Sequence, residues 1–164
     1  NRNVYRLGQS AMNYRGMATT VVMAYIRDNV AYLTNIGDSR AYLFRNGRLK
    51  RVTKDHTYVN ELIKKGLITE KEAETHSQKN VITKAVGAEF EAEPDFYRVN
   101  LEPEDVMVLC SDGLYGEVGE DRMTDVLKMA VAKGTGMNEL CADFVDEAIL
   151  AGGRDNITVI CIRI

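Results

Sequence analysis

The sequence predicts an α+β domain built on antiparallel β-sheet. Short β-branched and apolar segments joined by tight turns occupy the first half, and two longer segments of helical periodicity follow in the second half. Turn signals at Arg27-Asp28-Asn29 and at Asn46-Gly47 indicate two hairpins. Hairpins followed by a pair of helices are typical of a layered α+β domain. The predicted strands are residues 16–26, 30–36, 41–44, 49–52, 96–101, 106–110 and 157–164.

Helices are predicted from periodicity and end signals. Residues 1–14 have a helical spacing with no cap in front, like the end of a helix whose start is missing. Residues 57–65 end at the C-cap candidate Gly66. Thr69-Glu70-Lys71-Glu72 resembles a capping box that opens a short helix ending near His76. The two later helices are predicted over residues 121–132 and 137–150.

Composition and charge exclude several classes of protein. With 164 residues and 45% hydrophobic content, residues 1–164 are expected to form a single domain. A net charge of -3 without a basic block argues against nucleic acid as a partner but leaves phosphorylated protein open. The three cysteines show no metal-binding spacing, which favours buried thiols in a reducing compartment. Without a signal peptide or membrane-spanning run, a cytoplasmic location is expected.

Three aspartates stand beside strand ends and glycines. The apolar run Val106–Cys110 is followed by Ser111-Asp112-Gly113, Asp38 follows Gly37, and Asp155 precedes the last strand. Taken singly, each would more often serve a turn or a helix cap. Taken together, they predict one site for a hard divalent cation, because Mg²⁺ and Mn²⁺ prefer oxygen ligands.

Such a site suits phosphoester hydrolysis. Two divalent ions about 3.5–4 Å apart can bind a phosphoryl oxygen and activate a water for in-line attack. This chemistry needs no nucleophilic side chain, and the sequence has no Ser-His or Cys-His arrangement and no glycine-rich phosphate loop.

Five ordered motifs resemble those of the metal-dependent protein phosphatases, the type 2C serine/threonine phosphatases, and most closely their compact bacterial branch. The motifs are Gly16-Met17-Ala18-Thr19-Thr20, Gly37-Asp38-Ser39-Arg40, Asp55-His56-Thr57, Ser111-Asp112-Gly113-Leu114 and Gly153-Arg154-Asp155-Asn156. The resemblance implies a β-sandwich between two layers of helices, a four-layer α-β-β-α fold that here lacks its N-terminal strands. It also implies removal of phosphate from phosphoserine or phosphothreonine by a metal-activated water, on substrates of a serine/threonine kinase.

The resemblance also assigns roles to residues. It implies a binuclear Mn²⁺ or Mg²⁺ centre, with a third ion in the bacterial enzymes. Residues 57–84 would form a flap beside the active site, with His76 handling substrate. Asn156 would orient a metal-bound water. The implied metal positions are Asp112, Asp155, Asp38 and Gly113.

One part of the family pattern has no counterpart here. Family members begin with strands that carry a phosphate-binding Arg, an acidic ligand and an Asp-Gly-x-Gly-Gly-His segment, and this chain lacks them. We therefore expect the isolated chain to bind Mn²⁺ weakly and to hydrolyse p-nitrophenyl phosphate poorly or not at all. Two alternatives remain open: a non-catalytic phosphatase-like binding or signalling module, and a structural Ca²⁺ site without catalysis.

Three further polar residues carry weaker signals. His56 is expected to cap or to support a neighbouring group rather than to bind metal. Arg40 could pair with a carboxylate, hold the Asp38 loop or contact phosphate. Ser111 is expected to form hydrogen bonds rather than to act as a nucleophile, because no base lies near it in sequence.

Overall fold

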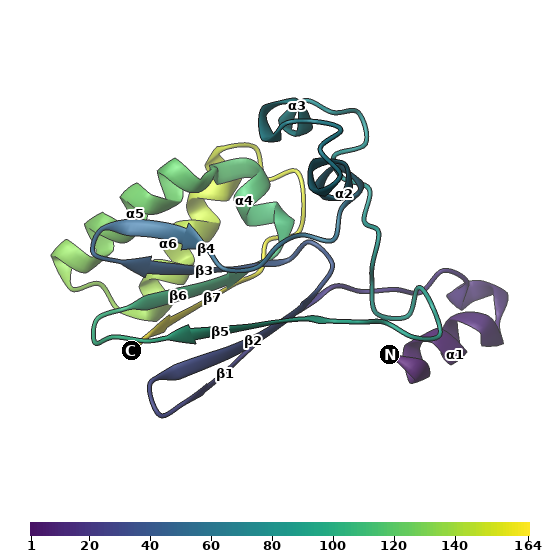
Figure 1. Ribbon diagram of the computed structural model, residues 1–164. Helices are drawn as coiled ribbons and strands as arrows, with labels where there is room; N and C mark the ends of the chain where they lie inside the picture. Colours follow the sequence, from purple (N-terminus) through teal and green to yellow (C-terminus); the bar gives the residue numbers. More distant parts are fainter.

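The computed structural model describes all residues from 1 to 164 and contains two β-sheets and six α-helices (Figure 1). The strands are β1 (Val21–Arg27), β2 (Val30–Ile36), β3 (Arg40–Arg45), β4 (Arg48–Arg51), β5 (Asp95–Asn100), β6 (Val106–Cys110) and β7 (Val159–Arg163). The helices are α1 (Arg2–Ser10), α2 (Tyr58–Lys64), α3 (Glu70–Glu74), α4 (Asp112–Val118), α5 (Glu120–Lys133) and α6 (Met137–Leu150), with a 3-10 turn η1 at Met12–Tyr14.

Both sheets are antiparallel, and they pack face to face. One has the strand order β1-β2-β5 and the other β4-β3-β6-β7. Side chains from both sheets form an apolar cluster between them, with Leu33 of β2 and Met107 of β6 among its buried members. The predicted β-sandwich is therefore present, and its core follows from the alternation of apolar residues along the strands.

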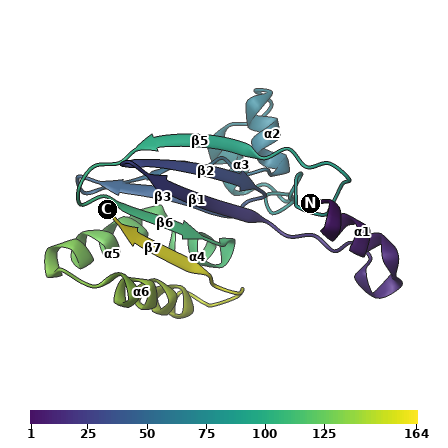
Figure 2. The same ribbon diagram turned by 90° about the horizontal axis from the view of Figure 1, so that it is seen from below.

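Helices cover only one outer face of the sandwich. Helices α4, α5 and α6 lie on the β4-β3-β6-β7 sheet, where Phe144 and Leu127 pack against Val108 (Figure 2). The outer face of the β1-β2-β5 sheet carries exposed side chains such as Tyr25 and Phe96. Three of the four layers implied by the resemblance are thus present in this chain. None of the helices combines the length and the apolar character that a membrane crossing would require.

Local signals in the sequence are confirmed where a short-range interaction decides the structure. The Asn46-Gly47 turn has both residues at positive φ, as a tight hairpin requires. Thr69 and Glu72 form the complete capping box of α3. The first strand, by contrast, begins at Val21 rather than at residue 16, because Val21 pairs with the last residue of β2, Ile36, and the preceding residues have no strand beside them.

The segment after β6 differs from the prediction. Asp112 is exposed and lies two residues after the end of β6, as the sequence predicts, but it is also the first residue of helix α4, a helix that the sequence pattern does not predict. Two glycines, Gly113 and Gly116, lower the helical propensity of this seven-residue segment. Residues 57–84 hold α2 and α3, which project beyond the sheets (Figure 1).

Candidate functional site

Sheet topology gathers the three predicted aspartates at one end of the helix-covered sheet. Neighbouring antiparallel strands place the start of one beside the end of the next. In β3, β6 and β7, Arg40 pairs with Cys110 and Cys110 pairs with Val159. Asp38 therefore precedes β3, Asp112 follows β6 and the Asp155 loop precedes β7 at the same end of the sheet.

The loop that carries Asp155 lies directly against the start of α4. The Ser111 hydroxyl donates to the backbone oxygen of Asn156 at 3.2 Å and accepts from the Thr158 amide at 3.0 Å. A side chain at Gly113 would collide with the backbone oxygen of Asn156, so only glycine allows this approach. Ser111 thus has the hydrogen-bonding role that the sequence suggested.

Asp38 lies in a mostly buried loop. Its side chain receives no hydrogen bond from another side chain and makes no ion pair with Lys or Arg, and the residue is 8% exposed. Burial raises the pKa of the Asp38 carboxyl, and the negative charge of nearby Asp112 raises it further. Two carboxylates that repel one another at a shared site are an arrangement that a bound cation would relieve.

The donor chemistry at this sheet end fits a hard divalent cation, but the structure does not assemble a complete ligand set. None of the three aspartates forms an ion pair, since Arg154 is engaged by Glu117 and Arg40 by Asp55. No group of three or more His, Cys, Asp or Glu side chains is arranged closely enough to hold an ion. The structure therefore brings the predicted ligands to one region without forming a three-ligand cluster.

The Asp38 loop is fixed by residues around Gly37. The Gly37 amide donates to Nδ1 of His56 at 3.1 Å, and the His56 amide donates to the Gly37 carbonyl at 2.9 Å. Gly37 has φ +103°, and a side chain there would collide with Thr20. The Thr20 hydroxyl in turn shares a 2.8 Å hydrogen bond with Ser39. His56 is buried and supports this loop, in agreement with the role expected from the sequence.

Arg40 is engaged by a carboxylate. Its guanidinium donates from Nε and Nη2 to both oxygens of buried Asp55, with distances of 2.6–3.1 Å. The central carbon of the Arg40 guanidinium, Cζ, lies 3.4 Å from the centre of the Tyr115 ring. Of the three roles considered for Arg40, the structure shows pairing with a carboxylate beside the Asp38 loop.

The contacts of His76 lie within residues 57–84. Its ring is 6.1 Å from that of Tyr58, and Nδ1 accepts a hydrogen bond from the Gln78 amide. No hydrogen bond or ion pair joins His76 to any of the three aspartates. The predicted handling of substrate by His76 therefore stays a prediction.

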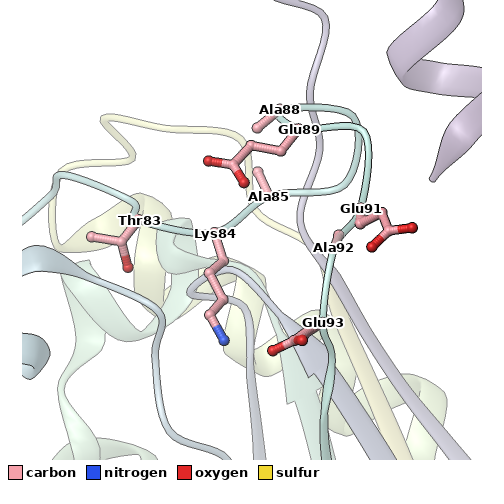
Figure 3. Close-up of a pocket in the computed structure, with 8 residues that line it drawn as sticks. All are labelled: Thr83, Lys84, Ala85, Ala88, Glu89, Glu91, Ala92 and Glu93. Carbon is pink, nitrogen blue, oxygen red and sulfur yellow. The ribbon is translucent and has the colours of Figure 1, made fainter.

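A separate pocket of about 290 Å³ lies in the segment that leads into β5 (Figure 3). It contains none of the predicted site residues. Its lining is Thr83, Lys84, Ala85, Ala88, Glu89, Glu91, Ala92 and Glu93.

Three more residues lie around the aspartates: Tyr115 and Glu117, which the sequence did not indicate, and Asp55, which it indicated only as part of the Asp55-His56-Thr57 motif. Tyr115 donates its hydroxyl to the backbone carbonyl of Asp38 at 3.0 Å, and burial raises the pKa of this phenol, so it keeps its proton. Glu117 accepts two hydrogen bonds from Arg154, at 2.9 and 3.0 Å. Asp55 binds Arg40. The only sequence signal for Tyr115 and Glu117 was their place three and five residues after Asp112.

Comparison with known proteins agrees with the fold and with the motifs. The family described as Protein phosphatase 2C matches residues 5–62. A serine/threonine phosphatase stp from Listeria welshimeri is 36% identical over 163 residues, which are 99% of this chain and 63% of that protein. The chain thus spans less than two thirds of the length of this curated relative.

Solved structures show the same relationship. The serine/threonine phosphatase of S. agalactiae is 36% identical with a TM-score of 0.92, over 99% of this chain and 65% of that one. The catalytic domain of the phosphatase PstP, solved in complex with two manganese ions, is 31% identical with a TM-score of 0.80, over 98% of this chain and 64% of that one. By sequence and by fold, the chain therefore belongs to the protein phosphatase 2C family.

Proposed function

We propose that the protein containing this chain is a metal-dependent serine/threonine protein phosphatase that hydrolyses phosphoserine and phosphothreonine in protein substrates. The observation that carries the proposal is that β3, β6 and β7 bring Asp38, Asp112 and Asp155 to the same end of one sheet, where none of the three forms an ion pair with Lys or Arg. A relative solved with two manganese ions supports Mn²⁺ or Mg²⁺ as the cofactor, with two or three ions in the complete domain.

The residues have distinct tasks in this proposal. Asp38, Asp112 and Asp155 hold the cations, with Gly113 beside them, and Asn156 orients the attacking water. When bound, divalent cations supply charge neutralisation for the phosphoryl group and a lowered pKa for water. Residues 57–84 form a flap in which His76 contacts the substrate. A phosphatase that reverses a serine/threonine kinase would act in signalling in the cytoplasm.

The test is phosphate release from a phosphothreonine peptide and from p-nitrophenyl phosphate by the full gene product, with and without Mn²⁺. Loss of a residue that only supports a metal ligand lowers activity by up to about 100-fold. We therefore expect Mn²⁺-dependent turnover that Asp112→Asn, a change at a proposed ligand itself, reduces by more than about 100-fold. Asp143→Asn, the same change at an exposed position of α6, is the control and should leave the rate unchanged. The 164-residue chain alone is expected to be slow or inactive.

The alternative of a non-catalytic module is favoured by one observation, the absence of any three-residue ligand cluster. Binding of Mn²⁺ by the full gene product without turnover of either substrate would establish this alternative. Turnover that is unchanged by Asp112→Asn would contradict the non-catalytic alternative and also the assignment of Asp112 as a ligand of the catalytic cations.

A further inference from the structure

We infer that helix α4 is the frame of the site: Tyr115 holds the Asp38 loop and Glu117 holds the Asp155 loop, so that both act as positioning residues. The consequence for cation binding rests on the proposed function, whereas the two contacts are seen directly in the fold. Asp112 itself is the first residue of the same helix.

The first contact joins α4 to Asp38. Tyr115 lies three residues after Asp112 and therefore on the same side of the helix. Its hydroxyl donates to the Asp38 carbonyl, and its ring lies against Arg40. The Arg40 side chain is 17% exposed, and its Nε and Nη2 donate hydrogen bonds to Oδ1 and Oδ2 of buried Asp55. The Tyr115 ring thus has one well-defined position, and its hydroxyl fixes the loop relative to the helix.

The second contact joins α4 to the Asp155 loop. The Glu117 side chain is 8% exposed and accepts both hydrogen bonds from Arg154, the residue before Asp155. Glu117 lies close to Gly152, where an added Cβ would be 3.0 Å from its carboxylate. At the start of the helix, Gly113 contacts Asn156 from the same loop. Both ends of the Asp155 segment are therefore held against α4.

These two contacts set the spacing of three carboxylates from separate parts of the chain. Ligands of a cation cluster must be held within about 0.5 Å of the productive geometry. Because Asp112 belongs to α4, any shift of the Tyr115 or Glu117 contact changes the distance from Asp112 to one partner only. The two contacts are thus separable, and each can be removed alone.

The experiment measures amide hydrogen exchange by NMR in the 164-residue chain without metal. The Gly37 amide, which donates to His56, reports on the Asp38 loop, and the Thr158 amide, which donates to Ser111, reports on the Asp155 loop. Tyr115→Phe removes the hydroxyl and leaves the ring on Arg40. Glu117→Gln removes the charge and keeps the side-chain volume.

Two variants make matched controls. Tyr42→Phe removes another hydroxyl that contacts Arg40, at 3.1 Å from Nη1, but has no contact with Asp38. Glu147→Gln removes the charge from a similar pair with Arg122, between α5 and α6 and outside the site.

Arg154→Lys is a second test of the contact with Glu117. The Arg154 side chain is 75% exposed, and lysine in its place cannot form two parallel hydrogen bonds.

We expect Tyr115→Phe to raise exchange at Gly37 about fivefold, as for the loss of one partly buried hydrogen bond, with Thr158 unchanged. Glu117→Gln and Arg154→Lys should raise exchange at Thr158 about threefold, as for a partly exposed ion pair, with Gly37 unchanged. The inference is overturned if the paired controls have equal effects at these amides. It is also overturned if each variant affects both loops alike, since α4 would then be unfolding as a whole.

Metal binding gives a second measurement in the full gene product. Tyr115→Phe should weaken Mn²⁺ binding about tenfold, in the range seen when a residue supporting a metal ligand is lost, while Tyr42→Phe should not. Absence of Mn²⁺ binding in the wild-type protein, with the exchange pattern as expected, would remove the proposed function and leave the frame intact. If the wild-type protein binds Mn²⁺ but the variants leave the exchange rates at Gly37 and Thr158 unchanged, the positioning role of α4 is refuted and the proposed function stands.

Discussion

The two sheets of the sandwich differ in how they are covered. Every residue of β6 is buried, because helices lie on one side of its sheet and the second sheet lies on the other. In β1, exposed residues alternate with half-buried ones, and Met23 and Tyr25 remain more than half exposed. The candidate site is built at the end of the helix-covered sheet, next to fully buried β6, where rigid packing can hold polar side chains in place.

The largest effect that this comparison predicts is in the helical layer. Phe144 of α6 is fully buried, and Phe144→Ala should lower the free energy of unfolding by about 4 kcal/mol, the usual cost of a large cavity in a core. Urea denaturation followed by circular dichroism measures this change. A cost below about 1 kcal/mol would mean that the helices are not firmly packed on the sheet.

A smaller effect is expected where the two sheets are joined. Arg45 of β3 donates to both oxygens of buried Asp105 and also to the Asn100 carbonyl at the end of β5. Asp105→Asn should cost about 2 kcal/mol, because it removes hydrogen bonds made by charged groups. Glu102→Gln, on the exposed partner of Arg45, is the control and should cost much less.

The same pair predicts a pH dependence. Burial opposes ionisation of Asp105, but the hydrogen bonds from Arg45 and from the Glu102 amide outweigh it, so the pKa of Asp105 is lowered. A lowered pKa in the folded state means that the stabilisation is present above the unfolded value and is lost as pH falls through the folded one. The difference between wild type and Asp105→Asn should therefore shrink below about pH 3.9. A difference that grows on acidification would contradict this assignment.

The smallest effect on the free energy of unfolding is expected on the exposed outer face of the β1-β2-β5 sheet. Phe96 of β5 is 77% exposed, and Phe96→Ala should change the free energy of unfolding by no more than about 0.5 kcal/mol. The substitution is chemically the same as Phe144→Ala, so the pair compares the two faces directly. Equal costs for the two variants in the same urea experiment would show that the β1-β2-β5 face is covered in solution.

Short-range patterns predicted most of the elements. Alternating apolar residues gave β5 within one residue at each end, and helix α6 was predicted with its observed bounds. Helix α4 was missed because its glycines argue against a helix, although Gly113 is required by the close approach of Asn156. Gly113, which the tertiary contact with Asn156 requires, therefore weakens the local sequence signal for helix α4.

The sequence alone indicated the family and predicted the three aspartates as ligands, because each motif is a short continuous run that can be recognised without knowing which residues lie beside it in the fold. Only the tertiary structure placed Tyr115 on Asp38, Glu117 on Arg154 and Arg40 on Asp55. These pairs are separated by 77, 37 and 15 positions in the chain. No periodicity or spacing links residues so far apart, since their contact depends on which strands become neighbours and on which face a helix is packed.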